Sequence, residues 1–251
     1  MENRRIGGHY SHRYDAELEE VVNRVLAMGG LVESQLSNAL QAFIDGDSPV
    51  AQEVTENDTR VNTFEVTIDE RCVEILARRQ PAAMDLRLIV AVIKTITDLE
   101  RIGDLAASIA RMALRQAQGD RPRKQTFRDI ETMGNRVIKM LGDALDAFAR
   151  MDAAAAVTVV RQDFAIDSDH EAIMRQNVTY MMEDPRNISR MLDVTHATRA
   201  LERVGDHARN MCEYTIYLVK GRDVRHIDLS EMEAIVEEKA VQGTNKKGTD
   251  L

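Results

Sequence analysis

The 251-residue sequence has no tryptophan, only 4% aromatic residues and two cysteines, Cys72 and Cys212. The scarcity of aromatic residues argues against a stacking platform for single-stranded nucleic acid. The net charge of −9 argues against a phosphate backbone or an anionic membrane as the partner. Because the two cysteines have neither metal-ligand nor redox spacing, we interpret them as small buried hydrophobes in a reducing compartment.

Long apolar stretches are missing as well. The longest uninterrupted run, residues 88–93, is far short of the roughly 20 residues that cross a bilayer. No hydrophobic stretch follows the charged residues at the start of the chain, so a secretory signal peptide is not expected. These absences predict a cytoplasmic protein with no direct membrane insertion and no nucleic acid partner.

Proline is rare, and its four occurrences divide the chain at residues 49, 81, 122 and 185. Proline is tolerated in the first turn of a helix but not in its interior. With a further break near residues 150–152, each remaining segment has apolar residues at helical spacing and no strand-like alternation. The sequence predicts long helices over 14–45, 49–79, 82–117, 123–149, 153–182 and 186–219. A shorter helix is expected from Glu231 to about Ala240, followed by a disordered tail.

The second half of the chain repeats the first. A shift of 105 positions carries eight apolar or small residues of the first helix onto the fourth, seven of them unchanged, including Phe43 onto Phe148. A shift of 102 superposes Leu-Glu-Arg-Ile-Gly-Asp at 99–104 on Leu-Glu-Arg-Val-Gly-Asp at 201–206. The predicted fold class is all-α, with two tandem pseudo-symmetric three-helix bundles. The predicted ranges are 1–13 for a flexible N-terminal segment, 14–117 and 123–221 for the bundles, and 222–251 for a C-terminal helix and tail.

Each copy of the repeated motif places a glutamate and an aspartate four residues apart on one helix face, beside a glycine. Like charges at this spacing destabilise a helix by a few tenths of a kcal/mol, and an interior glycine by about 1 kcal/mol relative to alanine. Because both halves contain the like-charge pair and the interior glycine despite their cost in stability, we favour a metal site over a merely solvated acidic face. Gly103 and Gly205 would leave room for a neighbouring helix with more ligands. The primary candidate ligands are Glu100, Asp104, Glu202 and Asp206.

Polar stripes on the second helix of each half could supply further ligands, although an ordinary solvated face explains these stripes equally well. Their candidate members are Asp58, Asn62, Glu65 and Asp69 in the first half, and Asp163, Asp167 and His170 in the second. Met174 stands where the second stripe would need a counterpart of Asp69. Arg101 and Arg203 are either counter-charges of the carboxylates or surface residues. His207 lies off the acidic face, and we expect it to be structural or at the surface. The oxygen ligands fit Fe, Mn, Mg or Zn.

The two motifs, in this order within the repeat, resemble the PhoU family, the phosphate-specific transport system accessory proteins. Residues 85–88 before the first motif and 180–188 before the second add to a resemblance that covers residues 14–221. The resemblance implies two three-helix bundles, each with a metal-associated Glu/Asp-x-x-x-Asp motif. It also implies a cytoplasmic, often dimeric, negative regulator of the phosphate-starvation response. Such a regulator couples the phosphate ABC transporter, through its ATPase, to a sensor histidine kinase. The halves are unequal, because Asp98 precedes the first motif where the second has Ala200.

Two other functions remain open from the residues alone. A carboxylate-bridged metal enzyme on a helical bundle usually takes Glu-x-x-His from two helices, and the sequence contains no Glu-x-x-His. A purely structural helical scaffold would explain the repeat but not the paired acidic motifs. The sequence offers no nucleophile–base pair and no phosphate-cradling loop that would oppose the role implied by the resemblance. The predicted function is therefore the one that the PhoU resemblance implies, a non-enzymatic regulator.

Overall fold

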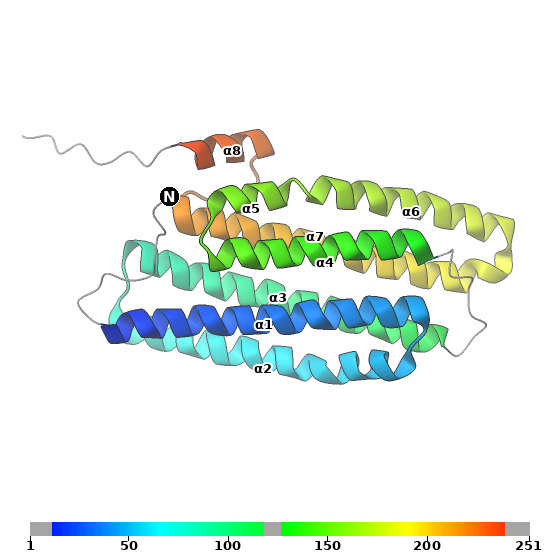
Figure 1. Ribbon diagram of the computed structural model, residues 1–251, viewed down its shortest axis with the longest axis horizontal. Coiled ribbons are helices and arrows are strands. Elements are labelled where there is room, and N and C mark those ends of the chain that lie inside the picture. The colour runs from blue at the N-terminus through cyan, green and yellow to red at the C-terminus, as the bar shows by residue number, and fades with distance from the viewer. Residues whose placement is uncertain (1–11, 118–126, 239–251) are drawn as a thin grey trace, which may run out of the picture.

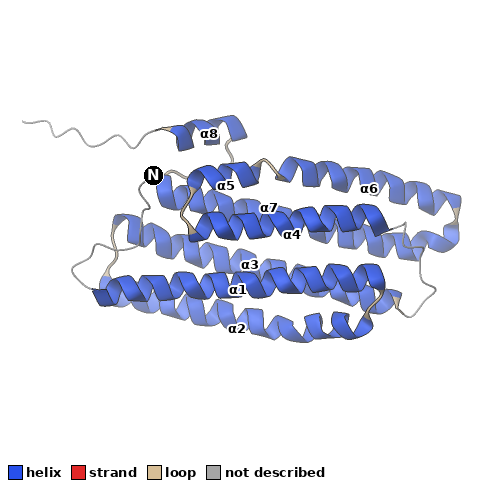
Figure 2. Cartoon of the chain, viewed as in Figure 1, coloured by secondary structure: helices blue, strands red, loops and turns tan. Residues whose placement is uncertain are grey.

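The computed structural model describes residues 12–117 and 127–238, and their regular elements are all helical (Figure 1, Figure 2). The first half contains α1 (His12–Asp45), α2 (Ser48–Arg79) and α3 (Ala83–Gln116). The second half contains α4 (Arg128–Ala149), α5 (Ala153–Val160), α6 (Asp163–Glu183), the short 3₁₀ helix η2 (Pro185–Asn187) and α7 (Ile188–Lys220). A short helix, α8 (Leu229–Glu237), follows. The predicted all-α fold with two tandem three-helix bundles is confirmed.

The two bundles lie side by side along their length (Figure 1). Within the first, α1, α2 and α3 pack against one another, and within the second α7 packs against α4, α5 and α6. The bundles meet where α1 contacts α4 and where α3 contacts α7. Phe43 and Phe148, which the repeat superposes, are both fully buried, and one continuous apolar core runs through both bundles. The halves are therefore parts of one packed unit.

Aspartates are the N-cap residues of several helices that follow breaks in the sequence. Asp152 caps α5 by accepting hydrogen bonds from the backbone N–H groups of Ala154 and Ala155. Asp47, which the repeat superposes on Asp152, caps α2 in the same way through Val50. Asp228 caps α8 through the N–H of Glu231, so this helix begins two residues before the expected Glu231.

The helix predicted over 153–182 is interrupted in the structure. At Arg161 and Gln162 the backbone makes tight turns, and the N–H of Gln162 donates to the carbonyl of Val159 at 2.9 Å. Long-range contacts hold this break: Arg161 donates to Glu233 on α8, and Gln162 donates to Asp143 on α4 at 2.9 Å. The helical period continues through the break, so the sequence pattern alone gives no sign of it.

Within the described ranges, no helix is both long enough and apolar enough to span a bilayer. Three predicted segments lie outside those ranges: the N-terminal segment up to residue 11, the start of the fourth helix over 123–126, and the tail after residue 238.

Candidate functional site

Four carboxylates from α2 and α3 form the first acidic group: Asp58, Glu65, Glu100 and Asp104. Burial, followed by the charge of Asp104, raises the pKa of Glu100 above its usual 4.5, and the charges of Glu65 and Asp58 act in the same direction. Burial and the charge of Asp104 likewise raise the pKa of Asp58. The negative charges of this group therefore act on one another across the two helices.

One oxygen of the first acidic group lacks a partner. Oδ1 of Asp58 is buried and accepts no hydrogen bond from any described residue. Arg101 supplies a counter-charge, with Nε 3.5 Å from Glu100 Oε2 and Nη1 3.6 Å from Asp104 Oδ2. Its side chain is 58% exposed, so both ion pairs are weak ones at the surface. A hard cation suits this donor set, because all the donors are oxygen and one of them is buried and unsatisfied.

The second acidic group comes from α6 and α7, and its members are Asp163, Asp167, Glu202 and Asp206. Burial, followed by the charges of Glu202 and Asp167, raises the pKa of Asp206. Burial and the charge of Asp167 also raise the pKa of Asp163, which is only 4% exposed. Three carboxylates of the first group thus have counterparts in the second, since Asp163, Glu202 and Asp206 match Asp58, Glu100 and Asp104, whereas Asp167 matches Asn62 and Glu65 matches His170.

Arg209 makes the two groups different. Its Nη1 donates to Oδ2 of Asp163 at 3.3 Å, and its Nε donates to Oε1 of Glu213, also at 3.3 Å. The shift of 102 that superposes the motifs places Arg209 on Ala107 of the first half. Sequence reasoning missed Arg209, although it follows Asp206 by three residues and so shares the acidic face of α7.

The motif glycines face the neighbouring helix of each half. A Cβ on Gly103 would lie 3.2 Å from Cγ1 of Val61 on α2. A Cβ on Gly205 would lie 3.4 Å from Oδ1 of Asp163 on α6. A side chain at Gly103 would therefore press on α2, whereas a methyl group at Gly205 would make an ordinary contact with α6.

Two other predicted ligands, Asn62 and Asp69 on α2, are exposed. Nε2 of His170 is buried and has no hydrogen-bonding partner in residues 12–117 and 127–238. In the same ranges no three acidic, histidine or cysteine side chains converge closely enough to hold an ion as they stand. Occupation by a metal would require the carboxylates of a group to turn toward a common point.

A polar cluster joins the two bundles beside the first motif. Nδ1 of His207 on α7 lies 2.6 Å from Oδ1 of Asp98 on α3, and Asn210 Nδ2 donates to the same oxygen at 3.4 Å. Burial, followed by the charge of Asp98, raises the pKa of the nearby Tyr214. The sequence gives no sign of this cluster, because its members lie on helices far apart in the chain.

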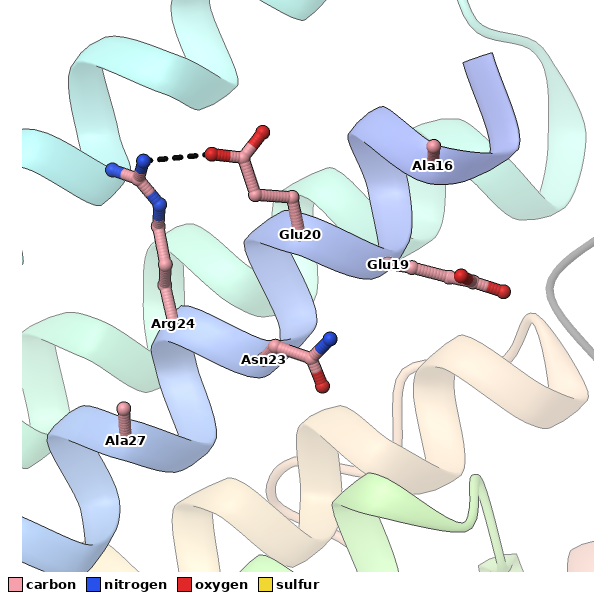
Figure 3. Close-up of a pocket in the computed structure, with 6 residues that line it drawn as sticks. All are labelled: Ala16, Glu19, Glu20, Asn23, Arg24 and Ala27. Atoms are coloured by element: carbon pink, nitrogen blue, oxygen red, sulfur yellow. Dashed lines mark hydrogen bonds and ion pairs between the residues drawn. The ribbon is translucent and has the colours of Figure 1, made fainter. Parts of the chain in front are cut away.

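A cleft of about 400 Å³ lies along α1, away from both acidic groups (Figure 3). Within it, Arg24 donates to Glu20 at 2.7 Å, and the side chains of Glu19 and Asn23 point away from this ion pair. The residues that line the cleft are Ala16, Glu19, Glu20, Asn23, Arg24 and Ala27. None of the predicted site residues lines this cleft.

Comparison with known proteins gives consistent matches over both bundles. The PhoU domain family matches residues 25–113 and 130–215. A Pseudomonas putida protein named phosphate-specific transport system accessory protein PhoU homolog is 52% identical over 95% of this chain and 93% of its own length. The Escherichia coli K12 protein named phosphate-specific transport system accessory protein PhoU is 45% identical over 94% of this chain and 97% of its own length.

Solved structures agree with this assignment. The crystal structure of PhoU from Pseudomonas aeruginosa has 52% sequence identity and a TM-score of 0.80, covering 83% of this chain and 100% of that chain. The phosphate transport system regulatory protein PhoU from Streptococcus pneumoniae has 30% identity and a TM-score of 0.77, covering 84% of this chain and 99% of that chain. The chain therefore belongs to the PhoU family, whose members are accessory and regulatory proteins rather than enzymes.

Proposed function

We propose that the protein is a cytoplasmic regulator of phosphate transport that keeps the phosphate-starvation response off when phosphate is plentiful. The observation that carries this proposal is the extent of the similarity, since the 52% identity to the Pseudomonas putida accessory protein spans 95% of the chain and so includes both bundles and both motifs. The name of the Streptococcus pneumoniae structure, which describes a regulatory protein of phosphate transport, supports the same role.

The partners in this proposal are the phosphate ABC-transporter ATPase and a sensor histidine kinase, and the working unit is a homodimer. The outer helices offer apolar side chains for such contacts. Val66 and Val73 on α2 are both 55% exposed, and Val178 and Met182 on α6 are 53% and 80% exposed. Each pair shares one side of its own helix, since its members are seven or four residues apart, and exposed apolar patches mark surfaces that bind other proteins.

Metal binding by carboxylates of the acidic groups belongs to the proposed function. Asp58, Glu65, Glu100 and Asp104 would hold a cation in the first half, and Asp163, Asp167, Glu202 and Asp206 are the candidate ligands of the second. A bound divalent cation, whether Fe, Mn, Mg or Zn, would supply the positive charge that offsets the repulsion among these carboxylates. Ion binding of this kind adds to the stability of the fold and can fix the surface presented to a partner.

A phosphate-starvation reporter in the native host tests the regulatory role. The reporter is read in high phosphate with the gene for this chain deleted and then restored. We expect high output on deletion and low output on restoration. Low output in the deletion strain would contradict the proposal and leave a structural scaffold as the better description.

Equilibrium dialysis against Mn²⁺ tests the metal sites separately from regulation. The full-length chain is compared with a variant that carries Glu100→Gln, Asp104→Asn, Glu202→Gln and Asp206→Asn. We expect the variant to lose most of its Mn²⁺ uptake, while Asp146→Asn, an exposed change on α4, which carries no member of either group, leaves uptake unchanged. Sedimentation velocity on the same samples checks the proposed homodimer.

A further inference from the structure

We infer that Arg209 is a built-in cation that replaces metal in the second acidic group, so that the first group alone takes up a divalent ion. The inference rests on the proposed metal-binding function and concerns how that binding is divided between the two halves. It is based on a difference between two matching aspartates. Asp163 on α6 accepts a hydrogen bond from Arg209, whereas Asp58 on α2 has a buried oxygen without a hydrogen-bonding partner among the described residues.

In the second half the buried aspartate already has a positive partner. Asp163 is 4% exposed and accepts a hydrogen bond from Arg209 Nη1 at 3.3 Å. The guanidinium of this α7 residue thus reaches the buried α6 member of the group.

A second carboxylate holds Arg209 in place. Its Nε donates to Glu213 Oε1 at 3.3 Å, and Glu213 is itself buried, with 7% of its surface exposed. A metal ion that displaced the guanidinium from Asp163 would weaken the pairing of this buried Glu213 as well. Although 37% of the Arg209 side chain is exposed, both of its carboxylate partners are buried, and a buried charge left without compensation is unfavourable. Ion entry into the second group is therefore opposed by the fold.

The first half lacks this arginine. The position that matches Arg209 is Ala107, a buried apolar residue, and no described residue donates a hydrogen bond to the buried Oδ1 of Asp58. The charge of Arg111 acts on Asp58, but burial and the charge of Asp104 outweigh it. A divalent ion would give Asp58 the partner that Asp163 already has.

Arg101 does not act in the first group as Arg209 does in the second. It pairs with Glu100 and Asp104 at 3.5 and 3.6 Å from the solvent side, and its side chain is 58% exposed. Exposed pairs of this kind contribute little, so an incoming ion displaces Arg101 at small cost. The first group is therefore open to a cation, whereas the second contains a fixed one.

Mn²⁺ uptake by the full-length chain, followed by the electron paramagnetic resonance signal of the free ion, tests this assignment. Mn²⁺ is a suitable probe because it favours carboxylate oxygens. We expect Asp58→Asn to abolish most of the wild-type uptake and Asp163→Asn to leave it unchanged. Arg209→Gln should roughly double the Mn²⁺ bound per chain, because it frees the second group for an ion.

Two companion variants separate the charge of Arg209 from its packing. Arg209→Lys keeps a positive charge and should show wild-type uptake, whereas the double change Arg209→Gln with Asp163→Asn should lose the uptake that Arg209→Gln gained. Circular dichroism establishes that each variant is folded. If Arg209→Gln proves unstable without metal, added Mn²⁺ should raise its Tm more than that of the wild type.

The possible failures are distinct. If Asp58→Asn and Asp163→Asn each remove half of the wild-type uptake, or if Arg209→Gln binds no more Mn²⁺ than the wild type, the inference is overturned while the proposed metal binding stands. If neither the wild type nor any variant takes up Mn²⁺, the proposed metal binding itself fails, and the inference fails with it.

Discussion

Gly29 of α1 forms the hole into which Leu145 of α4 fits. A Cβ on Gly29 would lie 2.9 Å from Cδ1 of Leu145 and closer still to its Cδ2. The repeat produces the same contact a second time, since Gly134 of α4 receives Leu40 of α1, with Cδ1 2.8 Å from the position of a Cβ. Two matching glycine–leucine contacts thus join the bundles in a pseudo-two-fold manner.

Filling one of these holes should weaken the joint between the bundles. Gly29→Val places a side chain where Leu145 lies, and overpacking of this kind is expected to destabilise the protein by about 1–3 kcal/mol. Gly30→Ala is the matched control, because a Cβ at Gly30 meets no atom within 4 Å. This change should stabilise α1 by about 0.5–1 kcal/mol, as alanine is the better helix former. Urea unfolding measures both changes, and a Gly29→Val protein as stable as Gly30→Ala would contradict the account.

A second prediction concerns the ion pair between Glu17 and Arg79. Arg79 donates twice to this carboxylate, from Nε at 3.0 Å and from Nη2 at 2.9 Å, and only 9% of the Glu17 side chain is exposed. The hydrogen bonds from Arg79 hold the pKa of Glu17 below its usual 4.5. Glu17→Gln should therefore reduce the free energy of unfolding at pH 7 by about 1–3 kcal/mol.

The pH dependence of this loss follows from the lowered pKa. A carboxylate with a depressed pKa in the folded state contributes stability above pH 4.5, and that contribution disappears as the pH falls through the lowered pKa. The difference between Glu17→Gln and the wild type should shrink on acidification below pH 4.5. Glu171→Gln removes an exposed ion pair with Arg175 and should change the free energy of unfolding by less than about 0.5 kcal/mol, both at pH 7 and below pH 4.5. A difference for Glu17→Gln that does not depend on pH would argue against the ion pair.

Features that depend on local sequence were predictable. Apolar spacing, the prolines and the breaks between segments predict the long helices, because all of these act within a few residues. The repeat adds the division into two bundles, since residues such as Phe43 and Phe148 can occupy matching core positions only if the halves fold alike. The helices that carry the acidic stripes and the motif carboxylates are neighbours, since α2 contacts α3 and α6 contacts α7, while metal binding by these residues stays a prediction.

Features that depend on distant partners were not predictable. Arg209 and Asp163 are 46 residues apart, and His207 and Asp98 are 109 apart, so no local pattern connects either pair. The break at Arg161 is held by a residue of α8, 72 positions away. The packing of α6 on α7 decides which carboxylate pairs with which arginine. The spacing of apolar residues along the sequence carries no information about that packing.

The cluster around Asp98 gives a third prediction. Asp98 accepts from Asn210 and lies 2.6 Å from the His207 ring nitrogen, across the contact between α3 and α7. Asp98→Ala leaves these groups without their partner and should destabilise the protein by about 1–3 kcal/mol. Thr97→Ala, an exposed neighbouring change, should stay within about 0.5 kcal/mol of the wild type. Equal stability of the two variants would show that the cluster contributes nothing.

The last prediction concerns the repulsion within the first acidic group. Burial and the charge of Asp104 raise the pKa of Glu100, so its charged form is unfavourable in the folded, metal-free protein. A carboxylate with a raised pKa contributes stability below its usual 4.5 and loses that contribution as the pH rises through the raised value. In EDTA at pH 7, Glu100→Gln should therefore be more stable than the wild type by a few tenths of a kcal/mol, and this advantage should disappear below pH 4.5.

Mn²⁺ should make the wild type more stable than the Glu100→Gln protein. The ion stabilises only the folded state that binds it, so in excess Mn²⁺ the wild type gains stability that the Glu100→Gln protein gains more weakly. Thermal unfolding in EDTA and in Mn²⁺ measures both orders on the same samples. Glu53→Gln is the control, as an exposed change on α2 outside the group, and it should follow the wild type in both conditions. A Glu100→Gln protein less stable than the wild type in EDTA would mean that the pair with Arg101 outweighs the repulsion from Asp104. The acidic motif would then stabilise the fold without metal, as the second group does through Arg209.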